Sequence, residues 1–159
     1  MAKHRSLLSP TQFLTQLAEQ RRLWEPLITF DPWSRHYVQL ANQSGVEAWL
    51  LTWLPGQGTE WHDHGGSAGA FLPVRGELTE RQAMVQRDGP PRIHPEVRIV
   101  GSGMLRSFGT KHVHQVTNAG GEPAVSLHAY APALVEMNEY TVDGDRLRLV
   151  TAQRAGQSW

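Results

Sequence analysis

Three histidines in this chain have a spacing that could hold a metal ion. His62 and His64 flank Asp63, and His114 follows much later in the sequence. Side chains two residues apart on a β-strand point to the same face, so His62 and His64 can converge on one point while His114 comes from a separate strand. Three imidazoles from neighbouring strands leave coordination positions open on the ion. The pattern predicts a three-histidine metal site, although His-x-His pairs also occur on surfaces, and His112 competes with His114 for the third position.

The stretch Ser126-Leu127-His128-Ala129-Tyr130 contains a second unusual group. On a strand, Ser126, His128 and Tyr130 share one face, and the two apolar residues between them share the other. A hydroxyl, an imidazole and a phenol in register can form a hydrogen-bonded row that ends at the phenol. The alternative interpretation is the polar face of an exposed strand, which these residues alone do not exclude.

Charge and composition exclude several classes of function. The 159 residues carry 15 acidic and 15 basic side chains and a formal net charge of zero, so bulk electrostatic binding to nucleic acid or to an anionic membrane is not expected. The chain contains no cysteine, which excludes disulfides, a thiolate nucleophile and a zinc site built on sulfur. The N-terminus lacks the apolar core of a signal peptide, and no apolar run approaches the roughly 20 residues that span a bilayer. These features predict a soluble, cytoplasmic protein.

Residues 1–30 differ from the rest of the chain and predict one helix. Ser9 and Pro10 suit an N-cap and a first helical turn. The residues that follow at three- and four-residue spacing form one apolar face: Phe13, Leu14, Leu17, Arg21 and Trp24. We expect a single helix that packs on the outside of the remaining structure.

From residue 35 to residue 151 the sequence predicts β-strands. The chain has 15 glycines and 10 prolines, and they separate short apolar runs in a way that is typical of turns between strands. The expected strands cover residues 37–40, 47–54, 70–74, 78–86, 97–100, 104–108, 112–117, 124–131, 138–142 and 146–151. Short strands at this spacing indicate an all-β sandwich or barrel. We therefore expect one domain over residues 1–159, with a loosely attached tail from residue 152.

Two segments resemble the signature motifs of the cupin superfamily. The first covers residues 56–76 and includes His62 and His64, and the second covers residues 114–118. The resemblance implies a single cupin barrel, that is, a double-stranded β-helix or jelly roll, with a short N-terminal helix. It also favours His114 as the third ligand, because an asparagine follows that histidine four residues later.

A closer resemblance, over residues 37–132, is to the cysteine dioxygenases. Residues 114–118 and 122–132 are similar to the matching region of these enzymes, as are Trp53 and the His-Asp-His run. In that family three histidines hold Fe(II), and a Ser-His-Tyr row lines the site. Carried over by position, the resemblance implies His62, His64 and His114 as metal ligands and Ser126, His128 and Tyr130 as the catalytic row.

Gly69 marks two departures from related proteins. Many cupins have a glutamate ligand at this position, so its absence predicts three histidines without a carboxylate, and strand alternation points Asp63 away from the metal. Animal cysteine dioxygenases have a cysteine here that is cross-linked to the tyrosine of the row. No such crosslink can form in this chain, and Tyr130 is expected to be a free phenol, as in bacterial relatives.

The substrate-binding residues match the family less closely. Cysteine dioxygenases contact the substrate carboxylate through a Tyr-x-Arg run, and the nearest match here is Tyr37-Val38-Gln39, with glutamine in place of arginine. Relatives with that glutamine resemble 3-mercaptopropionate dioxygenases. A shift of two residues in the turn would let Arg35 supply the charge instead. Tyr37, Gln39 and Arg35 are therefore the candidate substrate contacts.

Together these features predict a monomeric, Fe(II)-dependent enzyme that uses O2 to oxidise a small thiol, with L-cysteine as the first candidate, to its sulfinic acid. The alternatives are a 3-mercaptopropionate dioxygenase, another metal enzyme on the same barrel, and a non-catalytic metal-binding cupin. Zinc is a further alternative to iron, because three-histidine sites also hold zinc. No partner other than a small-molecule thiol and O2 is expected.

Overall fold

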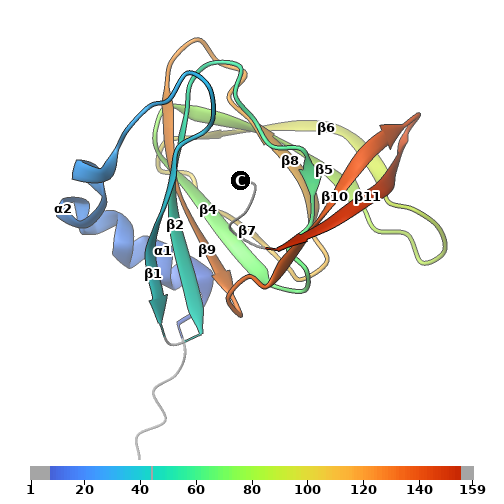
Figure 1. The fold of residues 1–159 in the computed structure, drawn as a ribbon, viewed down its shortest axis with the longest axis horizontal. Coiled ribbons are helices and arrows are strands. Elements are labelled where there is room, and N and C mark those ends of the chain that lie inside the picture. Colours follow the sequence, from blue (N-terminus) through green and yellow to red (C-terminus); the bar gives the residue numbers. More distant parts are fainter. Residues whose placement is uncertain (1–7, 44, 155–159) are drawn as a thin grey trace, which may run out of the picture.

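Two facing β-sheets form the body of the protein, and the helices lie outside one of them (Figure 1). The structure is a computed structural model that describes residues 8–43 and 45–154. Its strands are β1 (Tyr37–Gln43), β2 (Val46–Trp53), β3 (Trp61–His62), β4 (Ala68–Arg75), β5 (Glu77–Met84), β6 (Arg92–Gly101), β7 (Arg106–Phe108), β8 (Val113–Thr117), β9 (Ala124–Ala131), β10 (Glu136–Asp143) and β11 (Arg146–Arg154). One sheet has the order β1-β2-β9-β4-β7, and the other strands pair in the closed order β10-β11-β6-β5-β8-β3. The predicted all-β architecture is confirmed.

The N-terminal segment forms two helices and a 3-10 turn, and the prediction of a single helix is wrong. These elements are α1 (Pro10–Glu19), α2 (Arg21–Trp24) and η1 (Glu25–Leu27). At Gln20 the backbone leaves the helical region, with φ −91° and ψ 54°. The chain then buries Trp24, whose indole Nε1 donates a hydrogen bond to the Leu17 carbonyl at 3.1 Å. None of the described helices is long and apolar enough to cross a bilayer.

Helix α1 covers the outer face of the first sheet. The Ser9 side chain caps its first turn, as the sequence predicts. Leu14 and Leu17 are buried in one apolar cluster with Leu50 of β2 and Leu127 of β9. Because neighbouring residues on a strand point to opposite faces, the residues next to these leucines on β2 and β9 turn towards the space between the sheets. On β9 these neighbours are Ser126 and His128, whereas on β2 they are the apolar Trp49 and Leu51.

Strands β6 and β11 are longer than predicted. β6 begins at Arg92 and includes His94, where a loop was expected, because this part of the strand pairs with the end of β5. β11 continues to Arg154 because it pairs with β10 along its length, so residues 152–154 belong to a strand and not to a loose tail. Residues 155–159, the rest of the expected tail, lie outside the described residues.

Candidate metal centre and its cavity

Three imidazoles converge in the space between the sheets. β3 pairs with β8 in a register that places His62 directly opposite His114, so their Cβ atoms lie about 5 Å apart. The sequence predicted His64 on the same strand as His62, but His64 lies just after the end of β3. Its ring nevertheless turns to the same point. The ring centroids are 5.0 Å apart for His62–His64, 4.7 Å for His62–His114 and 5.0 Å for His64–His114. Ligand nitrogens of the three rings lie within 4.8 Å of one another.

The hydrogen bonds of these rings leave nitrogens available to coordinate a cation. His62 Nδ1 lies 2.8 Å from the carbonyl oxygen of Glu60, and His114 Nδ1 lies 2.8 Å from the carboxylate of Glu80. With Nδ1 donating in both rings, the lone pair is on Nε2. His64 is 1 % exposed, and neither of its nitrogens has a hydrogen-bond partner among the described residues. Burying these nitrogens without a partner is costly, and a metal ion would satisfy one of them.

Burial keeps all three rings in the neutral form that coordinates metals. It lowers the pKa of His62 and of His64 well below the usual value, and neighbouring histidines add to the effect. Burial also lowers the pKa of His114 to about 4, although its hydrogen bond to Glu80 acts in the opposite direction. The histidine group includes no carboxylate. These residues therefore fit a divalent cation with three neutral ligands and open positions for other molecules.

Glu80 on β5 holds the outer side of His114. Its carboxylate lies 2.8 Å from His114 Nδ1, 3.1 Å from His112 Nε2 and 2.6 Å from Arg106 Nε. Burial alone would raise the pKa of Glu80, but these hydrogen bonds hold it well below the usual value. The resulting anion orients the His114 ring and strengthens it as a ligand.

His112 belongs to this support and not to the three-histidine group. Glu80, His112 and His114 form a second group with metal-binding spacing. There, however, Arg106 already pairs with the Glu80 carboxylate, and a second cation beside this guanidinium would be repelled. We therefore assign the metal site to the three-histidine group.

Ser126, His128 and Tyr130 lie on the inner face of β9, and all three are buried. Ser126 Oγ lies 2.7 Å from His128 Nε2 and accepts a hydrogen bond from Trp53 Nε1 at 2.8 Å. Burial lowers the pKa of His128 to about 3, so its imidazole is neutral at neutral pH. Burial, together with the charge of Glu47, raises the pKa of Tyr130, which keeps the phenol protonated and able to donate a hydrogen bond.

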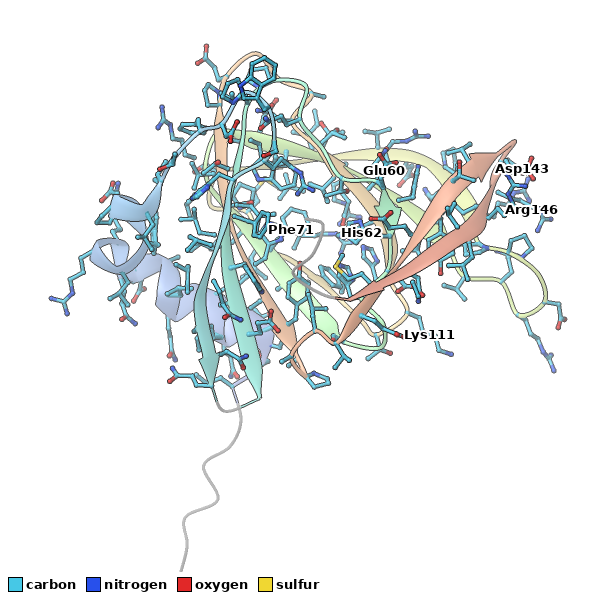
Figure 2. The ribbon with its side chains drawn as sticks, viewed as in Figure 1. Glu60, His62, Phe71, Lys111, Asp143 and Arg146 are labelled. Carbon is cyan, nitrogen blue, oxygen red and sulfur yellow. The ribbon has the colours of Figure 1, made fainter. Side chains whose placement is uncertain are left out.

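Both groups face one cavity of about 230 Å³. Its wall includes His62 and His114 on one side and His128 and Tyr130 on the other. Figure 2 shows His62 and Phe71 on opposite sides of this interior, and the Phe71 ring stacks on His128 with 5.5 Å between centroids. The two sheets thus bring a metal site and a row of neutral hydrogen-bonding groups to the same small space.

Of the three candidate substrate contacts, Arg35 is the one that lines the cavity. Its guanidinium carbon lies 5.0 Å from the centre of the Trp53 ring, and its buried Nη1 has no hydrogen-bond partner among the described residues. Burial lowers the pKa of Arg35 to about 10, so the group stays charged at neutral pH. Tyr37 packs against Trp49 at 6.0 Å, and Gln39 lies on the edge strand β1 with an exposed side chain. Neither of these two is among the cavity-lining residues.

The family model for cysteine dioxygenase type I matches residues 12–143, a span that contains the histidine group, Glu80, the Ser-His-Tyr row and Arg35. The chain belongs to the cysteine dioxygenase type I family. No curated protein matches it. The resemblance that the sequence motifs indicate is therefore confirmed at the level of the family.

Solved structures show the same fold as this cysteine dioxygenase family member. The protein TT1209 from Thermus thermophilus has a TM-score of 0.57 and 23% identity, over 68% of this chain and 92% of that one. A Klebsiella pneumoniae protein with a double-stranded β-helix domain has a TM-score of 0.57 and 15% identity, over 80% and 93%. An oxalate oxidase in complex with glycolate has a TM-score of 0.56 and 16% identity, over 67% and 55%. At these identities the likeness shows the fold alone, and it confirms the predicted cupin barrel.

No side chain fits at Gly69, the position of the cross-linked cysteine in animal cysteine dioxygenases. A Cβ atom there would lie 2.7 Å from the Phe108 ring and 2.8 Å from the Tyr130 ring. These rings also pack around His64, with centroid distances of 4.7 Å for Phe108 and 5.1 Å for Tyr130. The space that a glutamate or cysteine would occupy in relatives is therefore filled by the two aromatic rings.

Replacing Gly69 with alanine is expected to lower both stability and turnover, because Phe108 and Tyr130 must move. Overpacking of this kind typically costs about 1–3 kcal/mol of the free energy of unfolding. Denaturant unfolding and steady-state turnover would measure the two effects. Gly109→Ala is the matched control, since nothing lies within 4 Å of a Cβ atom there. Wild-type stability in the Gly69 variant would show that the rings shift without cost.

Replacing Glu80 with glutamine is expected to weaken metal binding about 10- to 100-fold, the usual effect of losing a carboxylate behind a histidine ligand. The amide can still hold His114, but it carries no negative charge and leaves Arg106 without its ion pair. Competition with a chelator would measure the affinity. Glu77→Gln, an exposed residue on the same strand, is the control. Equal affinities for all three proteins would refute a role for the Glu80 charge.

Two contacts of this centre were missed from the sequence. Glu80 alternates with buried Leu78 on β5, and a carboxylate at a core position needs partners, so this pattern could have drawn attention to it. Trp53 was named from the sequence as part of the family resemblance; it is buried in the core and also donates the hydrogen bond to Ser126. Asp63 was expected to point away from the metal, and it is not part of the histidine group; its carboxylate accepts a hydrogen bond from the Tyr140 hydroxyl on β10 at 2.7 Å.

Proposed function

We propose that this protein is an Fe(II)-dependent thiol dioxygenase that converts a small thiol carboxylate, with L-cysteine as the first candidate, to its sulfinic acid. The observation that carries the proposal is the position of Arg35. Arg35 is half-buried, its buried Nη1 has no hydrogen-bond partner among the described residues, and it lines the same cavity as His62 and His114. The combination suits a substrate whose carboxylate binds arginine and whose thiol binds a metal.

Each side chain then has a defined task. Arg35 binds the carboxylate and limits the orientations of the substrate in the cavity. Tyr130 donates a hydrogen bond from its protonated phenol to the bound substrate. His128, held by Ser126, forms the cavity wall beside Tyr130. His62, His64 and His114 would hold the iron, which when bound supplies the redox chemistry that O2 requires.

The reaction needs no external reductant. Both atoms of O2 enter the product, the sulfur of the thiol loses four electrons, and O2 gains the same four. The thiol proton is retained in the sulfinic acid or released to water. Zinc would fit the same imidazoles, but it has no redox chemistry to offer O2. The family and the reaction therefore favour iron.

The alternative substrate, 3-mercaptopropionate, was suggested by Gln39. That side chain is exposed and is not among the cavity-lining residues, so it does not support either thiol. Arg35 can bind the carboxylate of both molecules. The amino group, which L-cysteine has and 3-mercaptopropionate lacks, is therefore the feature by which the cavity could separate them.

O2 uptake and sulfinate formation by the Fe(II)-loaded protein test the proposal. We expect about one O2 consumed per sulfinate formed, and two labelled atoms in the product when the gas is oxygen-18. Zinc-loaded protein is the control and should consume no O2. If iron is bound but neither L-cysteine nor 3-mercaptopropionate is oxidised, the thiol dioxygenase proposal is refuted and a non-catalytic metal-binding cupin is favoured.

A further inference from the structure

Glu139 faces the cavity from the strand next to His62. β10 pairs with β3 so that Glu139 lies opposite His62, and His62 in turn lies opposite His114 on β8. Residues opposite each other in antiparallel strands share a face, with Cβ atoms about 5 Å apart. Glu139 therefore lies in one cross-strand row with two metal ligands, and its side chain lines the cavity.

The site described so far does not use this carboxylate. Glu139 is not part of the histidine group whose nitrogens lie within 4.8 Å of one another. Within the described part of the chain, no hydrogen bond or ion pair to its side chain occurs. A half-buried carboxylate in a small cavity has lost part of its hydration, and a donor from a bound molecule would compensate for this loss.

The charges that line the cavity are of both signs. Arg35 is the cation, and the carboxylates are those of Glu139 and Glu60. Glu60 is exposed and lies towards the outside of the barrel from His62 (Figure 2), so water solvates its carboxylate. Glu139 is the more enclosed of the two. A ligand with a carboxylate and an amino group would find a partner for each, whereas a ligand with a carboxylate alone would leave Glu139 unpaired.

We infer that Glu139 is a specificity-determining residue that accepts a hydrogen bond from the amino group of the substrate. The cavity thereby selects an aminothiol acid over a thiol carboxylate without nitrogen. This inference rests on the proposed function, because it concerns the substrate of the same site. It extends that function by assigning the recognition of the amino group to a residue opposite His62.

Binding of three thiols to the Fe(II)-loaded protein, measured by calorimetry without oxygen, tests the inference independently of turnover. L-Cysteine has both charged groups, 3-mercaptopropionate has the carboxylate, and cysteamine has the amino group. Glu139→Gln is expected to weaken the binding of L-cysteine and of cysteamine about tenfold, the effect of one charge-assisted hydrogen bond. The binding of 3-mercaptopropionate should be unchanged or tighter. Glu136→Gln, the same change at an exposed position of β10, is the control.

Arg35→Met should give the complementary result. This variant is expected to weaken the binding of L-cysteine and 3-mercaptopropionate and to leave the binding of cysteamine unchanged. The two variants together then assign the carboxylate of the substrate to Arg35 and its amino group to Glu139. Equal metal content and equal circular dichroism spectra would confirm that the variants are folded.

Unchanged thiol selectivity in Glu139→Gln, or equal weakening of all three thiols, would overturn the role of Glu139. If O2 uptake is then normal, thiol dioxygenation still stands. Selective binding without O2 uptake would support the role of Glu139 and refute the dioxygenase reaction. Absence of binding for all three thiols would overturn both.

Discussion

Replacing His64 with glutamine is expected to abolish metal binding and, with it, O2 uptake. His64 is buried, and neither ring nitrogen has a hydrogen-bond partner among the described residues, so the ion would be its one polar contact. Changing a residue behind a ligand already costs about 10- to 100-fold in metal affinity. Loss of a ligand should exceed the upper end of that range. Metal content after dialysis and chelator competition would measure it.

Two other histidines provide the controls for this variant. His94→Gln on β6 lies outside both metal-binding groups and should retain wild-type affinity. His112→Gln distinguishes the two groups, because His112 belongs to the one with Glu80 and not to the one with His64. If His112→Gln lost the metal while His64→Gln kept it, our assignment of the site would be wrong. Glutamine is used because it largely preserves the volume at these packed positions.

Replacing Arg35 with methionine is expected to reduce kcat/KM for L-cysteine by roughly 30-fold or more. Removing one partner of a buried, hydrogen-bonded charge pair costs about 2–5 kcal/mol, and about 1.4 kcal/mol is tenfold. Methionine keeps an unbranched side chain against Trp53, so the decrease in kcat/KM measures the loss of the guanidinium and not a loss of packing. Steady-state O2 uptake over a range of thiol concentrations would measure it.

Arg98→Met, on the exposed part of β6, is the matched control and should have wild-type kinetics. Lysine at position 35 should restore part of the activity, since it restores the charge but not the planar fork that binds a carboxylate at two points. A kcat/KM for Arg35→Met within a few-fold of wild type would show that the carboxylate is bound elsewhere.

Much of the fold follows from local patterns. Alternation along residues 124–131 predicted both a strand and the face that Ser126, His128 and Tyr130 share, and the structure confirms it. The cap at Ser9 predicted the start of α1. The end of that helix was predicted wrongly, because the break at Gln20 is stabilised by the burial of Trp24 against residues distant in the chain, a contribution that helical spacing does not contain.

The candidate metal ligands were predictable for a different reason. The chain has eight histidines, and the positions of three of them resemble the cupin motifs, so His62, His64 and His114 could be named without coordinates. The reason given for His64 was incomplete, since it lies beyond the end of β3 and reaches the site from the turn. The β3–β8 register brings the His62 and His114 rings together, and the turn after β3 adds the ring of His64.

The sequence by itself determined the residue types of the site: the histidines, the Ser-His-Tyr row, the absence of cysteine and the family. The tertiary structure decided which charged groups act with them. It places Arg35 and not Gln39 in the cavity, sets Glu80 behind His114, and brings Glu139 opposite His62. Strand register and the paths of loops settle these relations, and both depend on contacts between residues far apart in the chain.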